Sequence, residues 1–478
     1  MPAYRRVPAG GARALGAALA LGAALTATLT ATPSAAAPPD APHYRPIRRL
    51  SVAENGGHFG AALSAVGTRL LVGAPNLGTA GSTDAYAYLF DPATGERIDD
   101  LRVEVGADRW WQFSVGAVGE QPLVGIAPGD EADGLDGSVT VFDEAGGPIR
   151  TICCPGAIAL GVGEHVLVGG AGGGSLYDPA SGNLVRTYPI PDPSRRGVLS
   201  LALVGRSTIL IAAAHPVGIH MFDVRTGRAV GFVGTRHGDA RRFGSAMAVN
   251  GATLAATENP QVNVFDVGFG VYLGTIDPPP GLGGASFGAS LAYAGGLLAI
   301  GAPSGGDVGA VHLHDANGNV FESLPADGAG PGFGRAVAAL GRSVAVGAPT
   351  DDGGEVVIFS PCGDGAVDAP VEQCDDGNAD DTDGCDAACR IVASGGGDDD
   401  CGDVDGNGAR SVSDAVQILR AAAQLDSACG PARCDVDGNG AIGVTDGVQI
   451  LRAAAGLPFT PGCANRTASE RSSRAFPP

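Results

Sequence analysis

The sequence predicts a mainly β protein whose largest part is a seven-bladed β-propeller. Glycine is abundant, with 78 of 478 residues, and aromatic residues make up 5%. This composition is typical of many short strands joined by glycine turns. A unit of about 44 residues recurs seven times across 46–360, and each unit except the last has the apolar stretches expected of four strands. Four strands at this period are typical of a propeller blade.

Residues 1–37 have the features of a secretory signal peptide. A basic start containing Arg5 and Arg6 precedes an apolar stretch from Leu15 to Leu29, and small residues follow at 34–37. An uncleaved anchor is the alternative, but the apolar stretch is short for a bilayer span. We therefore expect a secreted protein, extracellular or at the cell surface, with no membrane span after cleavage.

The repeat is carried by a phenylalanine-glycine pair and a later glycine-alanine-proline triplet. The clearest copies are Phe59-Gly60 with Gly73-Ala74-Pro75, Phe287-Gly288 with Gly301-Ala302-Pro303, and Phe333-Gly334 with Gly347-Ala348-Pro349. These motifs resemble the FG-GAP repeat family, the propeller of integrin α-subunits and of many bacterial surface proteins. We expect the phenylalanines to pack between blades rather than to contact a ligand.

The last unit ends at Ser360 with only three strands. Residues 46–50 precede the first unit and match an outer strand, so we expect them to complete the seventh blade and close the ring. Closure removes the long exposed sheet edge that an open ring would leave. The propeller domain is accordingly assigned to residues 38–360.

Some FG-GAP repeats carry a calcium loop after the proline. Here Asp130, Asp133 and Asp136 come closest to that pattern; solvated loop carboxylates are the alternative. The loops at 76–84, 129–137 and 304–309 would present a surface to an extracellular protein or a glycan.

A cysteine-rich module is assigned to residues 361–391. It contains Cys362, Cys374, Cys385 and Cys389 within CGDG, CDDGN and DGC sequences, and it resembles the myxobacterial-type cysteine-rich repeat of secreted proteins. Zinc is the rival interpretation of four cysteines, but carboxylates rather than histidines surround them. We expect two disulfides, whose pairing the sequence leaves open. Residues 392–400 form an acidic, glycine-rich linker.

Residues 401–463 contain two near-identical loops about 32 residues apart, each followed by an apolar, helix-like segment. Oxygen ligands fall at loop positions 1, 3, 5 and 12, with glycine at position 6, as in an EF-hand. The predicted calcium ligands are Asp403, Asp405, Asn407, Ala409 and Asp414 in the first loop, and Asp435, Asp437, Asn439, Ala441 and Asp446 in the second. Folding of this segment should depend on the metal.

A loop followed by a single helix, repeated in tandem, resembles the type I dockerin family. The resemblance implies contacts with a cohesin-like domain through Val412, Ser413, Leu419 and Arg420, and through Val444, Thr445, Leu451 and Arg452. The likeness of the two copies would allow two orientations of the partner. Unlike the family, the repeats are framed by Cys401, Cys429, Cys434 and Cys463, for which we expect two further disulfides. A calcium-stiffened module without a partner remains the alternative. Residues 464–478 are expected to be a disordered tail.

The formal net charge is −21, a balance that disfavours nucleic acid and anionic lipid as partners. We find no nucleophile elbow, phosphate loop or HExxH zinc motif. The sequence therefore favours a non-enzymatic calcium-binding protein with an adhesive propeller and a tail for attachment or assembly. The alternative, by association with dockerins, is a component, catalytic or not, of an extracellular polysaccharide-degrading assembly.

Overall fold

The computed structural model describes residues 43–53, 57–75, 84–104, 111–128, 137–153, 158–170, 172–190, 197–214, 216–236, 243–280, 282, 286–304, 308–326, 328–330, 332–351, 353–375, 385–391, 401–404, 410–425, 427, 429, 431–455 and 457. They belong to two compact units. The first runs to Pro361 and includes Asp368–Val371; the second holds Cys362–Val367 and the chain from Glu372 onwards.

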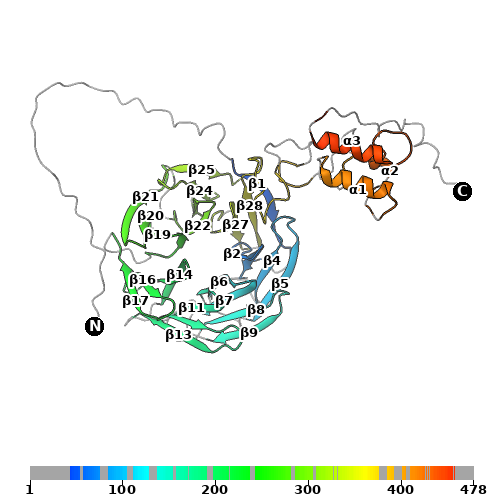
Figure 1. The fold of residues 1–478 in the computed structure, drawn as a ribbon. Coiled ribbons are helices and arrows are strands. Elements are labelled where there is room, and N and C mark those ends of the chain that lie inside the picture. Colours follow the sequence, from blue (N-terminus) through cyan, green and yellow to red (C-terminus); the bar gives the residue numbers. More distant parts are fainter. Residues whose placement is uncertain are drawn as a thin grey trace, which may run out of the picture. The chain divides into compact units, whose positions relative to one another are not determined.

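The first unit is a seven-bladed β-propeller, which confirms the predicted fold class. Seven antiparallel sheets of four strands stand around a ring, with the first strand of each blade toward the centre and the fourth at the rim (Figure 1). Among the described residues no helix is long and apolar enough to cross a membrane.

Blades one to four contain β2 (Ala62–Val66), β3 (Arg69–Ala74), β4 (Asp84–Phe90) and β5 (Arg97–Glu104); β6 (Trp111–Val118), β7 (Gln121–Pro128), β8 (Ser138–Phe142) and β9 (Pro148–Cys153); β10 (Ile158–Val162), β11 (His165–Gly170), β12 (Gly173–Tyr177) and β13 (Leu184–Pro189); and β14 (Val198–Val204), β15 (Thr208–Ala213), β16 (Gly218–Asp223) and β17 (Ala229–Val233). Blades five to seven contain β18 (Met247–Asn250), β19 (Thr253–Glu258), β20 (Gln261–Asp266) and β21 (Val271–Ile276); β22 (Ser290–Ala294), β23 (Leu297–Ala302), β24 (Ala310–His314) and β25 (Val320–Leu324); and β26 (Ala336–Leu340), β27 (Ser343–Thr350), β28 (Gly353–Ser360) and β1 (Arg45–Leu50).

Burial differs between the strands of a blade in the way their sequences predict. The second strands, such as β3 and β23, are buried at almost every position because a neighbouring blade covers each face. The outer strand β5 instead alternates exposed and buried residues, since only one of its faces is covered. The hydrophobic core is therefore divided into clusters between adjacent blades.

The repeated phenylalanines lie in these clusters, as the sequence indicates. Phe333 packs with residues of blades six and seven, and Phe287 packs with residues of blades five and six. Each contacts the ring near the end of the third strand of its own blade, Phe333 with Phe359 and Phe287 with His314, at 6.1 Å between ring centroids. The phenylalanine before each inner strand thus packs both against the third strand of its own blade and against the preceding blade.

The glycines of the repeat permit close approach between blades. A Cβ on Gly301 would lie 2.1 Å from the carbonyl oxygen of Gly334 in the next blade, and one on Gly347 would lie 2.0 Å from that of Gly60. The Gly334 carbonyl also accepts a 2.8 Å hydrogen bond from the Ser290 hydroxyl. Glycine is needed at 301 and 347 because the backbone of the following blade occupies the side-chain position.

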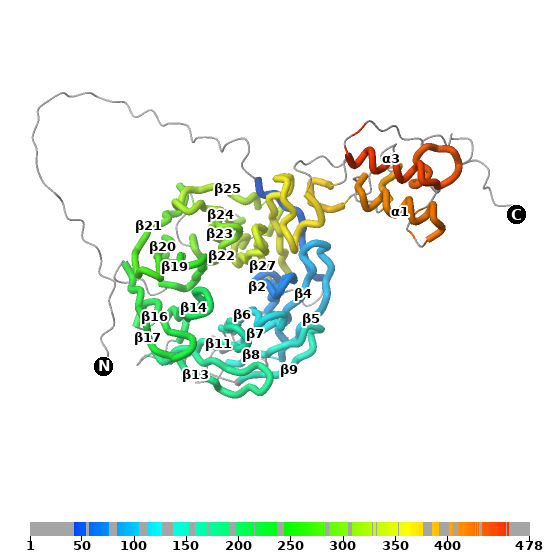
Figure 2. Tube along the Cα trace, in the orientation of Figure 1, coloured from blue at the N-terminus to red at the C-terminus, as the bar shows by residue number. Residues whose placement is uncertain are grey.

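The ring is closed by the N-terminal strand. β1 pairs antiparallel with β28, from Arg45 opposite Ser360 to Leu50 opposite Val356, so the two strands lie side by side (Figure 2). An ion pair of 3.0 Å joins Arg49 to Glu355 across this pair. The seventh blade therefore combines both ends of the propeller sequence.

The second unit contains α1 (Val412–Ala422), the short α2 (Pro431–Cys434) and α3 (Val444–Ala454). Its small core includes Ala415 and Ile418 of α1 and Ile450 of α3. Each long helix begins where an aspartate in its first turn accepts the backbone N–H of the preceding cap residue, at 2.8 Å in α1 and 2.7 Å in α3. Such acceptors satisfy donors that a helix start leaves unpaired.

Candidate metal centre

The second acidic loop brings three carboxylates together between α2 and α3. One oxygen each of Asp435, Asp437 and Asp446 lies within 4.8 Å of the other two. Oxygen ligands of this kind are those that Ca²⁺ prefers in proteins. These are three of the five ligands that the sequence predicts for this loop, with Asn439 and Ala441 on the same loop between them.

Backbone hydrogen bonds give the loop its shape. The Asp435 carboxylate accepts the N–H of Gly440 at 2.7 Å, and Gly440 has φ of +93°, a conformation that favours glycine. Asn439 accepts the N–H of Ala441 at 2.9 Å. Gly440 stands at loop position 6, where an EF-hand needs a sharp turn.

Asp446, at position 12, connects the beginning of the loop to the beginning of α3. One of its oxygens accepts the N–H groups of Val436 and Asp437 at 2.8 and 3.0 Å, and the other accepts that of Gly443 at 2.7 Å. The side chain is fully buried. Each carboxylate oxygen has two lone pairs, so the oxygen that accepts only the Gly443 N–H keeps one lone pair for a cation. Asp446 is thus both a candidate ligand and the residue that closes the loop.

The first loop has the same closing arrangement. Asp414 is fully buried and accepts the N–H of Val404 at 2.9 Å and that of Ser411 at 2.8 Å. Asp403, the predicted position 1 ligand, is also buried. The other predicted ligands of this loop, Asp405, Asn407 and Ala409, lie outside the described residues.

The helix surfaces carry the predicted partner residues, but the two copies are not equivalent. Val412, Ser413 and Arg420 on α1 are exposed, as are Val444, Thr445, Leu451 and Arg452 on α3. Leu419 is only partly exposed because it covers Gly447, where a Cβ would lie 2.6 Å from the leucine Cγ. The matching position on α1 is Ala415, which has a side chain of its own.

Sequence reasoning missed this asymmetry and also two exposed valines. Val416 and Val448 are 47% and 45% exposed, one helical turn after Val412 and Val444, so each helix presents an apolar stripe to solvent. The spacing of four residues was the available signal for the stripe. The glycine-for-alanine difference at 447 was the signal for the asymmetry.

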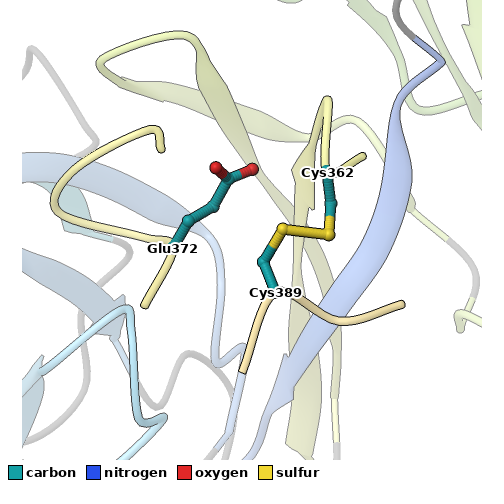
Figure 3. A group of neighbouring side chains, drawn as sticks. All are labelled: Cys362, Glu372 and Cys389. Atoms are coloured by element: carbon teal, nitrogen blue, oxygen red, sulfur yellow. A yellow bond between two sulfur atoms is a disulfide. The ribbon is translucent and has the colours of Figure 1, made fainter. Parts of the chain in front are cut away.

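The cysteine-rich module contains two disulfides, Cys362–Cys389 and Cys374–Cys385. Figure 3 shows the carboxylate of Glu372 beside Cys362–Cys389. Metal binding by this group is disfavoured because the metal ligand form of cysteine is the thiolate, and both sulfurs are already bonded to each other. A second carboxylate, that of Asp375, accepts the backbone N–H groups of Gly363 and Gly365.

Disulfides also frame the acidic loops. Cys429 is bonded to Cys434, and Cys401 is also disulfide-bonded. Cys463 lies outside the described residues.

The carboxylates and loops predicted as binding sites of the propeller are mostly outside the part of the chain that the structure describes. Asp130, Asp133 and Asp136, together with most of the loops expected to bind a partner, lie outside the described residues. Within the described part, the only groups of three potential metal ligands are those around Glu372 and Asp435.

The buried histidines His312 and His314 form hydrogen bonds through Nδ1. That of His312 is with the Ser323 hydroxyl at 2.8 Å, and that of His314 is with the Gly318 carbonyl at 3.1 Å.

Comparisons with known proteins identify the fold. No family model matches the chain, and no curated protein matches its sequence. Among solved structures, a chain from the crystal structure of a mitotic checkpoint complex is similar, with a TM-score of 0.50 and 16% identity over 71% of this chain and 99% of that chain. At this identity the likeness concerns the propeller fold alone.

Proposed function

We propose that this chain is a secreted, non-enzymatic, calcium-binding protein with two functional parts. The propeller binds an extracellular protein or glycan, and the tail attaches or assembles the molecule in a calcium-dependent manner. The observation that carries the proposal is the approach of Asp435, Asp437 and Asp446 to within 4.8 Å, on a loop whose sequence pattern occurs twice.

Charge supports a cation at this loop. Three carboxylates at such short distances repel one another, and a divalent cation converts that repulsion into attraction. When calcium is bound, it supplies a positive centre that holds the loop and the start of α3 together. The residues of the chain supply the oxygens, and Gly440 supplies the turn that lets them converge.

The exposed face of the helices supports a docking role for the tail. The ionisable side chains of α1 and α3 are Asp414 and Asp446, which are buried, and Arg420 and Arg452, which are exposed. The face offered to solvent is therefore apolar and positively charged within a segment that is otherwise acidic. It suits a partner with an apolar patch rimmed by carboxylates, such as a cohesin-like domain.

Calorimetric titration tests the proposal on the full-length protein after treatment with a chelator. We expect two calcium-binding events, with a gain of helical circular dichroism. Asp437→Asn should remove or weaken one event, and the corresponding Asp405→Asn should affect the other. Glu144→Gln, an exposed carboxylate on a propeller turn, is the matched control and should leave both events unchanged. Absence of calcium binding to the unsubstituted protein would overturn the proposal.

A further inference from the structure

The cysteines of the tail stand beside the first ligands of the two acidic loops. Cys434 directly precedes Asp435, and Cys401 precedes Asp403 by two residues. Both cysteines are disulfide-bonded, and both are buried, with 0% and 2% of their surface exposed. The covalent links are therefore placed where each loop begins.

The residues at the start of each loop, its entry, are also joined to each other, since the N–H of Gly402 donates to the Arg433 carbonyl at 2.7 Å. On the first loop itself, the Arg410 side chain donates to the Cys401 carbonyl at 2.8 Å. A Cβ on Gly402 would lie 2.1 Å from Ile450 of α3, so this entry is pressed against the helix. Movement of one entry would consequently disturb the other.

The sulfurs form a substantial part of the core that supports the loops. The buried cluster of the tail consists of Cys401, Val404, Ala415, Ile418, Cys434, Val436 and Ile450. A core of this size stabilises a fold weakly, and small domains generally need disulfides or metals in addition. The short ring closed by Cys429 and Cys434 fixes the backbone immediately before Asp435.

We propose that the Cys429–Cys434 disulfide positions Asp435 for calcium, so that calcium affinity and the redox state of this disulfide are coupled. The inference rests on the proposed calcium function. Thiol reagents that reduce the disulfide transfer two electrons to it: its S–S bond breaks, two thiols form, and a dithiol reductant becomes a disulfide. Reduction frees the backbone before Asp435 and weakens calcium binding, and by linkage bound calcium makes the disulfide harder to reduce.

The first test compares two double variants of the full-length protein by calcium calorimetry. Cys429→Ser with Cys434→Ser removes the positioning disulfide, whereas Cys374→Ser with Cys385→Ser removes a disulfide of the cysteine-rich module and is the matched control. Loss of groups that orient metal ligands costs about 10- to 100-fold in affinity. We expect a loss of that order in one binding event for the first variant, and unchanged affinity for the control.

The second test needs no substitution, so it decides the matter if the first variant fails to fold. The unsubstituted protein is treated with dithiothreitol, with calcium or with chelator, and newly formed thiols are alkylated and quantified by peptide mass spectrometry. Calcium should slow the appearance of thiols at Cys429 and Cys434 but not at Cys374 and Cys385. Equal protection of both disulfides, or of neither, would overturn the coupling.

The outcomes separate this inference from the proposed function. Calcium binding that is undiminished in the Cys429→Ser, Cys434→Ser variant refutes the positioning role and leaves the calcium function intact. If the unsubstituted protein binds no calcium, the calcium function fails and the coupling fails with it.

Discussion

Replacing Gly301 by alanine should destabilise the propeller through a clash between blades. The new Cβ would lie 2.1 Å from the Gly334 carbonyl oxygen, whereas carbon and oxygen in close contact are about 3.3 Å apart. The two backbones must therefore separate by roughly 1 Å. No side-chain rotation can relieve the contact, because both groups are fixed by strand and turn hydrogen bonds.

The magnitude follows from a matched comparison with Gly274→Ala. A Cβ on Gly274 of β21 meets nothing within 4 Å, so that variant keeps only the general effect of alanine, a stabilisation of about 0.4–1 kcal/mol through the unfolded chain. Because the same effect applies to Gly301→Ala, it cancels in the difference. Overpacking costs about 1–3 kcal/mol, and we expect a difference between the two variants near the upper end, about 3 kcal/mol.

Urea unfolding followed by tryptophan fluorescence measures this difference. The two tryptophans of the chain are Trp110 and Trp111, both within the propeller sequence, so the signal reports on this unit alone. The midpoint should fall for Gly301→Ala and stay constant or rise for Gly274→Ala, with similar denaturant slopes. Equal stability of the two variants would refute the argument that the repeat requires glycine for close approach of neighbouring blades.

Three further predictions concern other parts of the molecule. Deleting 43–50 removes β1 and leaves β28 as an open edge, so the same fluorescence assay should show a lower unfolding midpoint and light scattering should show aggregation; an unchanged midpoint would contradict closure by β1. Burial lowers the pKa of His220, His312 and His314. Below a pH of about 6.5 the unfolded chain therefore binds protons more readily than the folded chain does. The free energy of unfolding is then fully maintained above this pH and decreases as the pH falls below it. Substituting His312 and His314 by asparagine should weaken this dependence of the free energy of unfolding on pH. An unaltered dependence would count against the prediction. Gly447→Ala should displace Leu419 and lower the melting temperature of the tail followed by circular dichroism in calcium. Gly443→Ser should not, because serine caps α1 at the equivalent position and a Cβ at 443 has neighbours no closer than 3.5 Å.

The fold could be predicted because its information is local and repeated. Phe287, Gly288 and Gly301 recur at nearly constant spacing in other blades, and a repeat that cannot bury its own faces must stack against its neighbours. The EF-hand pattern at Asp435–Asp446 is likewise a local signal, since the turn and ligand spacing are set within twelve residues. The sequence also indicates the role of residues 46–50, because the last repeat unit has only three strands before it ends at Ser360.

Other features arise only when distant segments meet. The pairing of Cys362 with Cys389 depends on how the module folds, because four cysteines allow three pairings. The segment Asp368–Val371 joins the propeller unit, where Asp368 pairs with Arg342 at 3.4 Å and Val371 is fully buried. In the sequence this segment lies between Cys362 and Cys374, so the cysteine motifs assign it to the cysteine-rich module.

The sequence by itself determined the number of blades, the closing strand and the loop that brings carboxylates together, since each is written in repeated local spacing. Tertiary structure alone decided that Leu419 turns onto Gly447 while Leu451 stays exposed, and that the entries of the two acidic loops are joined through Gly402 and Arg433. The physical reason is that spacing fixes which groups can form an element. Which surface covers a given side chain depends on the volume and hydrogen bonds of residues that meet only in the folded chain.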